Sequence, residues 1–139
     1  MSNQDNLSGF YGEAIHVYTR AQAIADGVLV DVSTTAGEAG FRWPVALSQA
    51  AWEDCVAWTD SDNRRWVHQD EHGRLWDVLW MAVNAIRRDS SGQRALSFQL
   101  DRLPRHGKTR VASLTTLKLV VGPGDTGEPV VTIMLPAED

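Results

Sequence analysis

One apolar stretch decides the fold, GRLWDVLWMAVNAIRR at residues 73–88. Only Asp77 and Asn84 interrupt the apolar residues between Leu75 and Ile86. Apolar side chains would therefore surround most of the circumference of a helix, which is typical of a helix buried at the centre of a small protein. We predict a central buried helix over about 74–88, ending in two arginines where the helix dipole favours cations.

Downstream of this helix, apolar residues alternate with polar ones in three runs, at about 98–103, 117–121 and 131–135. Alternation with a period of two is typical of half-buried strands, so the runs predict a three-stranded antiparallel meander. The opposite face of the last two runs also carries apolar residues, such as Val120 and Val130. We expect more of the chain, or a partner, to cover that face. The predicted fold class is α+β, with an antiparallel sheet of three or more strands packed against the central helix and shorter helices.

Helix-capping signals organise the first part of the chain. Thr19 and Gln22 form a capping box, which predicts a short helix that ends at Gly27. Residues 28–32 then alternate as a strand does. A second capping box at Thr35 and Glu38 predicts one further helical turn, ended by Gly40.

Phe41 to Leu47 alternate again, and Pro44 lies among them. Proline cannot donate a ladder hydrogen bond, so we expect this strand at an edge of the sheet. Ser48 is suited to cap a helix that runs to about Trp58. Residues 59–74 form the longest polar stretch and predict a solvated loop.

Length and composition place the chain among small globular proteins. It has 139 residues, a net charge of −5 and a single cysteine, Cys55. We expect residues 1–9 to be a disordered leader and residues 10–139 to be one domain. A lone cysteine fits a reducing compartment, so we expect a cytoplasmic protein. The longest apolar run, 78–83, is too short to span a membrane, which needs about 20 residues.

Residues 68–72, HQDEH, match the H-x-x-E-H pattern of a zinc hydrolase. The pattern needs His68 and His72 one helical turn apart, with Glu71 as the base. Here it lies in the polar stretch and Gly73 follows at once. A solvated loop is the favoured interpretation, and we predict no metal site; a small zinc-dependent hydrolase is kept as the second alternative function.

Two other motifs also have structural interpretations. Residues 122–127, GPGDTG, match G-x-G-x-x-G, but Glu128 and Pro129 follow where a dinucleotide site needs a helix. We predict a hairpin connection and no cofactor. Cys55 lies on the apolar stripe of its predicted helix, so we expect a buried structural cysteine. We predict no catalytic residue, and the sequence favours a protein that is not an enzyme.

A basic segment lies between the first two predicted strands of the meander. Residues 101–110 have four basic residues against one acidic residue, a net of +3, so the rest of the chain carries −8. A basic hairpin tip on an acidic body can bind a nucleic-acid backbone or an acidic protein, or it can be a solvated loop. The candidate partner-binding residues of this segment are Arg102, Arg105, Lys108 and Arg110.

All six tryptophans lie between Trp43 and Trp80. Most are expected in the core, but Trp66 stands in the polar stretch beside Arg64 and Arg65 and joins the candidate binding residues. Acidic residues are dense over the same part of the chain, from Glu53 to Glu71. That density leaves open the alternative that the acidic body imitates DNA.

Four phrases resemble an uncharacterised bacterial family found on plasmids, integrative elements and phage-like regions. They are TRAQAIADGVLVDV at 19–32, AGFRWPVA at 39–46, GRLWDV at 73–78 and GPGDTGEPVVTIML at 122–135. The resemblance runs from about residue 15 to the end of the chain. It implies the genetic context of a mobile element and no particular catalytic residues.

These observations predict a non-enzymatic accessory protein of a mobile element that binds a host or element macromolecule. Protein is the favoured partner, and inhibition of host defence is one such role. The first alternative is a nucleic-acid-binding protein that uses the basic 102–110 hairpin. The net charge of −5 makes this alternative the weaker of the two.

Overall fold

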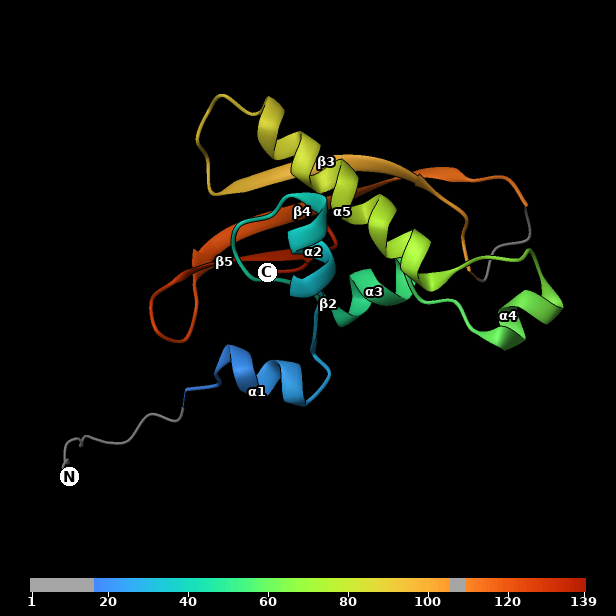
Figure 1. The fold of residues 1–139 in the computed structure, drawn as a ribbon, viewed down its shortest axis with the longest axis horizontal. Coiled ribbons are helices and arrows are strands. Elements are labelled where there is room, and N and C mark those ends of the chain that lie inside the picture. The colour runs from blue at the N-terminus through green and yellow to red at the C-terminus, as the bar shows by residue number, and fades with distance from the viewer. Residues whose placement is uncertain (1–16, 106–109) are drawn as a thin grey trace.

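The computed structural model describes residues 17–105 and 110–139. They form an α+β fold in which helices cover a five-stranded mixed sheet (Figure 1). The helices are α1 (Arg20–Ala25), α2 (Ser33–Ala39), α3 (Gln49–Cys55), α4 (Asp60–Arg65) and α5 (Glu71–Arg88). The strands are β1 (Leu29–Asp31), β2 (Val45–Ser48), β3 (Ala95–Arg102), β4 (Ser113–Pro123) and β5 (Pro129–Met134).

The last three strands form the predicted antiparallel meander. Phe98 of β3 pairs with Leu117 of β4, and Leu119 of β4 pairs with Ile133 of β5. Each of these side chains is at most 5% exposed, because all four face the helices across the core. The meander is thus confirmed, and α5 packs against it as expected.

The strand at 41–47 is where the sequence interpretation was wrong. The observed strand is β2, and it lies inside the sheet, in the order β1-β2-β5-β4-β3. It pairs antiparallel with β1 and parallel with β5, with Leu47 opposite Ile133. Pro44 is compatible with this position because it precedes the strand and uses only its carbonyl, which accepts the Val131 N–H at 2.8 Å.

Short helices begin where local signals place them, with one exception. Thr19 caps α1 in a capping box, Ser48 caps α3, and Gly40 ends α2 with a φ of +117° in the left-handed region. The exception is the predicted box at Thr35. The α2 helix begins at Ser33, two residues earlier, and no side chain caps it.

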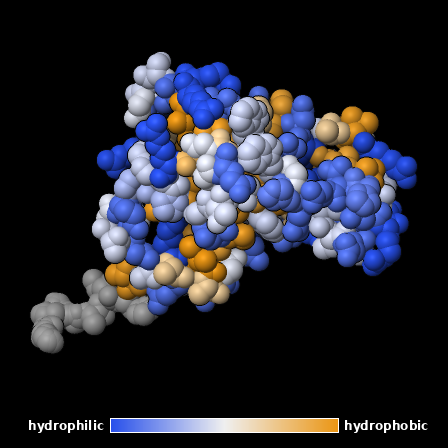
Figure 2. All heavy atoms as spheres, in the orientation of Figure 1, coloured by the Kyte–Doolittle hydropathy of each residue, from blue (hydrophilic) through white to orange (hydrophobic). Residues whose placement is uncertain are grey.

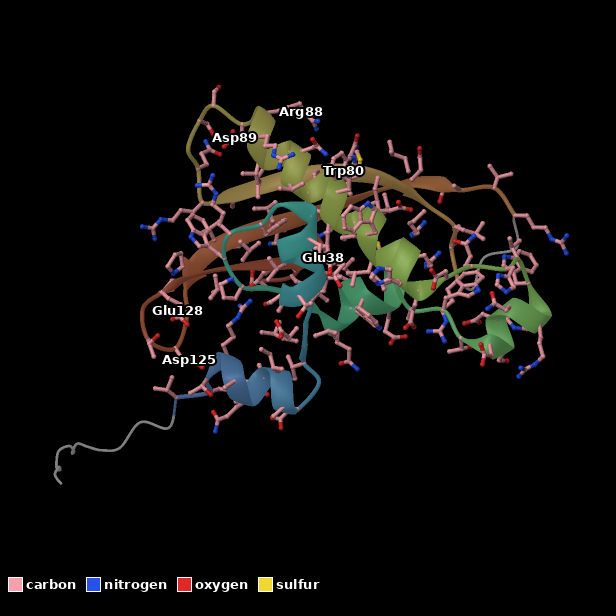
Figure 3. The ribbon with its side chains drawn as sticks, viewed as in Figure 1. Glu38, Trp80, Arg88, Asp89, Asp125 and Glu128 are labelled. Atoms are coloured by element: carbon pink, nitrogen blue, oxygen red, sulfur yellow. The ribbon has the colours of Figure 1, made fainter. Side chains whose placement is uncertain are left out.

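The polar stretch 59–74 is more ordered than a solvated loop. It holds α4, which begins with a capping box at Thr59 and Asp62, and the first turn of α5. The α5 helix is also less buried than its sequence predicts, since Trp80 is 45% exposed on its outer side (Figure 3). The helix therefore lies on the sheet with one face in the core and one face in solvent.

The second face of the sheet is covered in part by the chain itself. Arg20 of α1 donates to the Thr132 hydroxyl at 2.8 Å, and Glu138 accepts from the Ser48 hydroxyl at 2.6 Å. Val130 and Met134 on this face are less than a tenth exposed. Their apolar character therefore reflects burial within the protein.

Candidate functional site

The basic residues at the end of β3 and just after it contact the acidic helices α3 and α4. Arg102 donates to both Asp54 carboxylate oxygens, at 3.2 and 3.3 Å. Arg105 donates to Glu53 at 2.8 Å and to Asp62 at 2.9 Å. The two arginine side chains are 16% and 17% exposed, so they neutralise part of the acidic body internally.

Asp62 is the centre of this charge network. Its side chain is 4% exposed, and it accepts from the backbone N–H of Thr59 at 2.9 Å as well as from Arg105. The Thr59 N–H, followed by the Thr59 hydroxyl and the Arg105 guanidinium, holds the pKa of Asp62 well below its usual range. The carboxylate therefore stays charged and ties α4 to the residues that follow β3.

Trp66 lies directly after α4 and Arg110 lies over it. The guanidinium carbon of Arg110 is 5.5 Å from the centre of the Trp66 ring, a cation–π distance. Trp66 is half-buried, and its indole Nε1 is buried without a hydrogen-bond partner. Lys108, the remaining candidate from the basic segment, lies outside the described residues.

Arg74, in the first turns of α5, is a buried cation that the sequence interpretation missed. It is 6% exposed and lies over the Trp58 ring at 4.8 Å. Its guanidinium donates to the carbonyl oxygens of Val56 and Leu103, each at 3.0 Å. Burial is the main cause that lowers the pKa of Arg74, although an arginine remains protonated in proteins.

A signal for Arg74 was present in the sequence. Residues 74, 78, 82 and 85 share the helical spacing of one face, and the last three of them are core residues. Arg74 is thus a charged residue on the buried stripe of α5. An arginine at such a position needs partners within the protein or from a ligand.

Arg74, Arg102 and Arg110 come together around one pocket of about 260 Å³. Asp77 and Asp101 also line it, together with Gln69 and several apolar side chains. The side chains of the described residues contain three buried nitrogen or oxygen atoms that lack a partner, and all three are nitrogen donors: Nη2 of Arg74, Nε of Arg102 and Nε1 of Trp66. The first two belong to residues that line the pocket, and the third belongs to the ring that Arg110 covers. The pocket is therefore suited to bind an anion.

A second hollow adjoins this pocket and is more apolar. Trp80, Met81 and Leu114 line it, and it shares Asp77, Leu100 and Asp101 with the arginine pocket. Leu114 is 60% exposed at the beginning of β4. Figure 2 shows hydrophobic residues gathered at this end of the sheet, beside the polar surface over α3 and α4. A charged surface and an apolar surface thus lie next to each other.

Residues 8–139 match a family described as a family of unknown function, DUF6573. The chain belongs to this family. No curated protein and no solved structure matches the chain. The match fixes the family of this DUF6573 chain without assigning an activity to it.

The zinc-hydrolase residues of the DUF6573 chain do not form a metal site. His68 and His72 are both exposed, and the Glu71 carboxylate accepts the backbone N–H of Trp58 at 3.0 Å. Within residues 17–105 and 110–139, no group of three histidine, cysteine, aspartate or glutamate side chains could hold a metal ion. Glu71 thus serves to hold α5 against the segment before α4.

The glycine motif at 122–127 spans the end of β4 and the β4–β5 turn, so it is part of a hairpin connection, as predicted. Gly124 donates to the Glu128 carbonyl, and a strand follows. In Figure 3 the Asp125 side chain lies at this turn, near α1. Its carboxylate accepts the backbone N–H groups of Arg20 and Ala21, at 2.8 and 3.0 Å, so the turn caps a helix of its own protein.

Cys55 is buried, as the sequence predicts. It is 1% exposed, and burial, with a smaller contribution from Asp54, raises the pKa of its thiol to about 12. A thiol with this pKa is almost entirely protonated near neutral pH and is a poor nucleophile. Although Cys55 touches the arginine pocket, it is not suited to covalent chemistry there.

Proposed function

We propose that this protein is a non-enzymatic accessory protein of a bacterial mobile element that binds a macromolecule, and that the partner is a protein. The observation that carries the proposal is the arginine pocket with its unpaired buried donors, placed beside the hollow of Trp80, Met81 and Leu114. Protein interfaces combine aromatic and apolar anchors with charged residues in this way. Inhibition of host defence is one role that such binding would serve.

The charge distribution favours a protein partner over nucleic acid. Arg102 and Arg105 already pair with Asp54, Glu53 and Asp62, so little of their charge is left for a phosphate backbone. Asp77 and Asp101 also lie at the pocket. Nucleic-acid binding normally needs a continuous set of uncompensated cations.

The proposal places the protein in the cytoplasm. Its one cysteine is reduced and buried, which fits a reducing compartment. In the described part of the chain, none of the helices has the length and apolar composition of a membrane span.

Affinity capture tests the proposal. The tagged protein is incubated with lysate of its own host cells, with and without nuclease, and recovered proteins are quantified by mass spectrometry. We expect one stoichiometric protein that survives nuclease treatment. Recovery only while nucleic acid is intact would instead establish the nucleic-acid alternative.

Two charge-reversed variants locate the surface. Arg110→Glu changes an exposed side chain at the pocket, and Arg88→Glu makes the same change at the far end of α5 (Figure 3). We expect Arg110→Glu to lower recovery about tenfold, as the loss of an arginine hot spot does, and Arg88→Glu to leave it unchanged. Equal recovery by both variants would reject this surface.

A further inference from the structure

The unpaired atoms at the arginine pocket are all of one kind. Nη2 of Arg74 and Nε of Arg102 are buried donors on residues that line the pocket. Nε1 of Trp66 is a third buried donor, on a residue that does not line the pocket but lies under Arg110, which does. A buried donor without an acceptor destabilises the protein, because its hydrogen bond to water is lost and not replaced. A protein that places such donors around one pocket gains the most from a ligand that brings acceptor oxygens.

The charge of the pocket limits what that ligand can be. Among the described residues, three arginines and two aspartates line it, and Asp54 pairs with Arg102 from outside, so the charges at the pocket sum to 3 − 3 = 0. A wall without excess positive charge favours a ligand with one negative charge over a ligand with two. A phosphate dianion would bring a second negative charge close to Asp77 and Asp101, which is unfavourable in a partly buried site.

The volume and the lining residues of the pocket also favour a small ligand with a single carboxylate. Its volume of about 260 Å³ lies below the range of about 300–1,000 Å³ that is usual for small-molecule sites. Val67 and Leu103 contribute apolar surface. A short aliphatic stem would pack there, while the unpaired Nη2 of Arg74 and Nε of Arg102 would each donate to an oxygen of the carboxylate.

We propose that the pocket binds a single carboxylate on a short aliphatic stem, as in the glutamate side chain of an acidic protein segment. That the stem belongs to a partner rests on the function proposed above, whereas the preference for a carboxylate rests on the pocket alone. The same chemistry is offered by the carboxylate at the end of a polypeptide chain. Small probes separate these two sources.

The test is an NMR titration of the folded protein that follows the side-chain N–H signals of arginine Nε and tryptophan Nε1. The probes are N-acetylglutamate N-methylamide for a side-chain carboxylate, N-acetylalanine for a terminal carboxylate, inorganic phosphate, and N-acetylglutamine N-methylamide as the neutral control. We expect the glutamate probe to shift the Trp66 and Arg102 signals and to bind about tenfold more tightly than phosphate or the neutral probe, a difference of about 1.4 kcal/mol. Equal binding of phosphate, or no shift with the glutamate probe, would overturn the proposal. Tighter binding of N-acetylalanine would overturn the side-chain assignment.

Variants at Ala112 test the pocket without removing a buried arginine. Ala112 is exposed and lines the pocket, so a longer side chain is tolerated there. Ala112→Glu supplies a carboxylate from the protein itself, and Ala112→Gln is its neutral match. We expect Ala112→Glu to lose binding of the glutamate probe and Ala112→Gln to keep it. Equal binding by both variants would contradict the proposal.

The two proposals fail in different ways. If the wild-type protein binds the glutamate probe but captures no protein, the proposed function is refuted and the carboxylate-binding proposal is supported. A protein that captures a partner but ignores the probe would refute the pocket alone.

Discussion

Replacing Asp62 by alanine should destabilise the protein strongly, although Asp62 lies outside the central core. The two largest contributions that are lost are the capping bond from the Thr59 N–H and the buried charge-assisted bond from Arg105; the weaker bonds from the Thr59 hydroxyl and from the exposed Arg65 are lost with them. The first is worth about 1 kcal/mol and the second about 2 kcal/mol. The higher helix propensity of alanine returns about 0.5 kcal/mol, so we expect a net loss of about 2.5 kcal/mol.

Urea unfolding at pH 7, followed by tryptophan fluorescence, measures this loss. Asp60→Ala is the matched control, because Asp60 is an exposed acidic residue in the same helical turn. We expect the control to cost at most about 0.5 kcal/mol. If the two variants differ by less than about 1 kcal/mol, the network around Asp62 does not stabilise the protein as the structure implies.

The loss should also depend on pH in one direction. The native pKa of Asp62 is lowered, so its contribution is fully present above the unfolded value near 3.9. It is lost as the pH falls from there toward the native pKa, since the unfolded state then binds the proton first. The difference between wild type and Asp62→Ala should be constant from pH 7 to about pH 5 and should shrink below about pH 4.

Three further predictions concern the fold. Leu47→Ala should lower the free energy of unfolding, measured with urea, by about 3 kcal/mol, because Leu47 is fully buried on an interior strand. Leu114→Ala, at an exposed position, should lower it by less than about 0.5 kcal/mol, and similar losses for both variants would contradict the interior placement of β2. Cys55 should resist a thiol reagent at pH 8 in the native protein and react after unfolding, since burial raises its pKa to about 12; rapid native labelling would show that the thiol is accessible. Asp125→Asn should speed amide hydrogen exchange in α1, because the Asp125 carboxylate accepts the first N–H groups of that helix, and should leave exchange in α5 unchanged. Unchanged exchange in α1 would show that the β4–β5 turn does not stabilise this helix.

Local signals allowed much of the fold to be predicted. The caps at Thr19 and Ser48 and the end at Gly40 depend on residues within one helical turn, so the sequence shows them directly. The meander follows from alternation along each strand. The position of β2 could not be read in this way, because it depends on pairing with β5 more than 80 residues later, as between Leu47 and Ile133.

The candidate site was predicted only in part for the same reason. The basic segment was visible, but the partners of Arg105 lie 52 and 43 residues away, on Glu53 and Asp62. A run of charge in the sequence does not show whether distant acids neutralise it. Arg74 differs, because its position on the buried stripe of α5 could have been recognised from the sequence, although it was missed. A cation at a buried position needs partners.

The measurement that tests the central claim most directly is nuclease-treated affinity capture with the two Ala112 variants. The variants differ by one carboxylate at the pocket and leave the arginines, Trp66 and the apolar hollow in place. We predict that Ala112→Gln recovers the same protein partner as wild type and that Ala112→Glu recovers at least about tenfold less, since its own carboxylate occupies the pocket. Equal recovery of the partner by both variants would contradict the claim that the arginine pocket is where this protein binds.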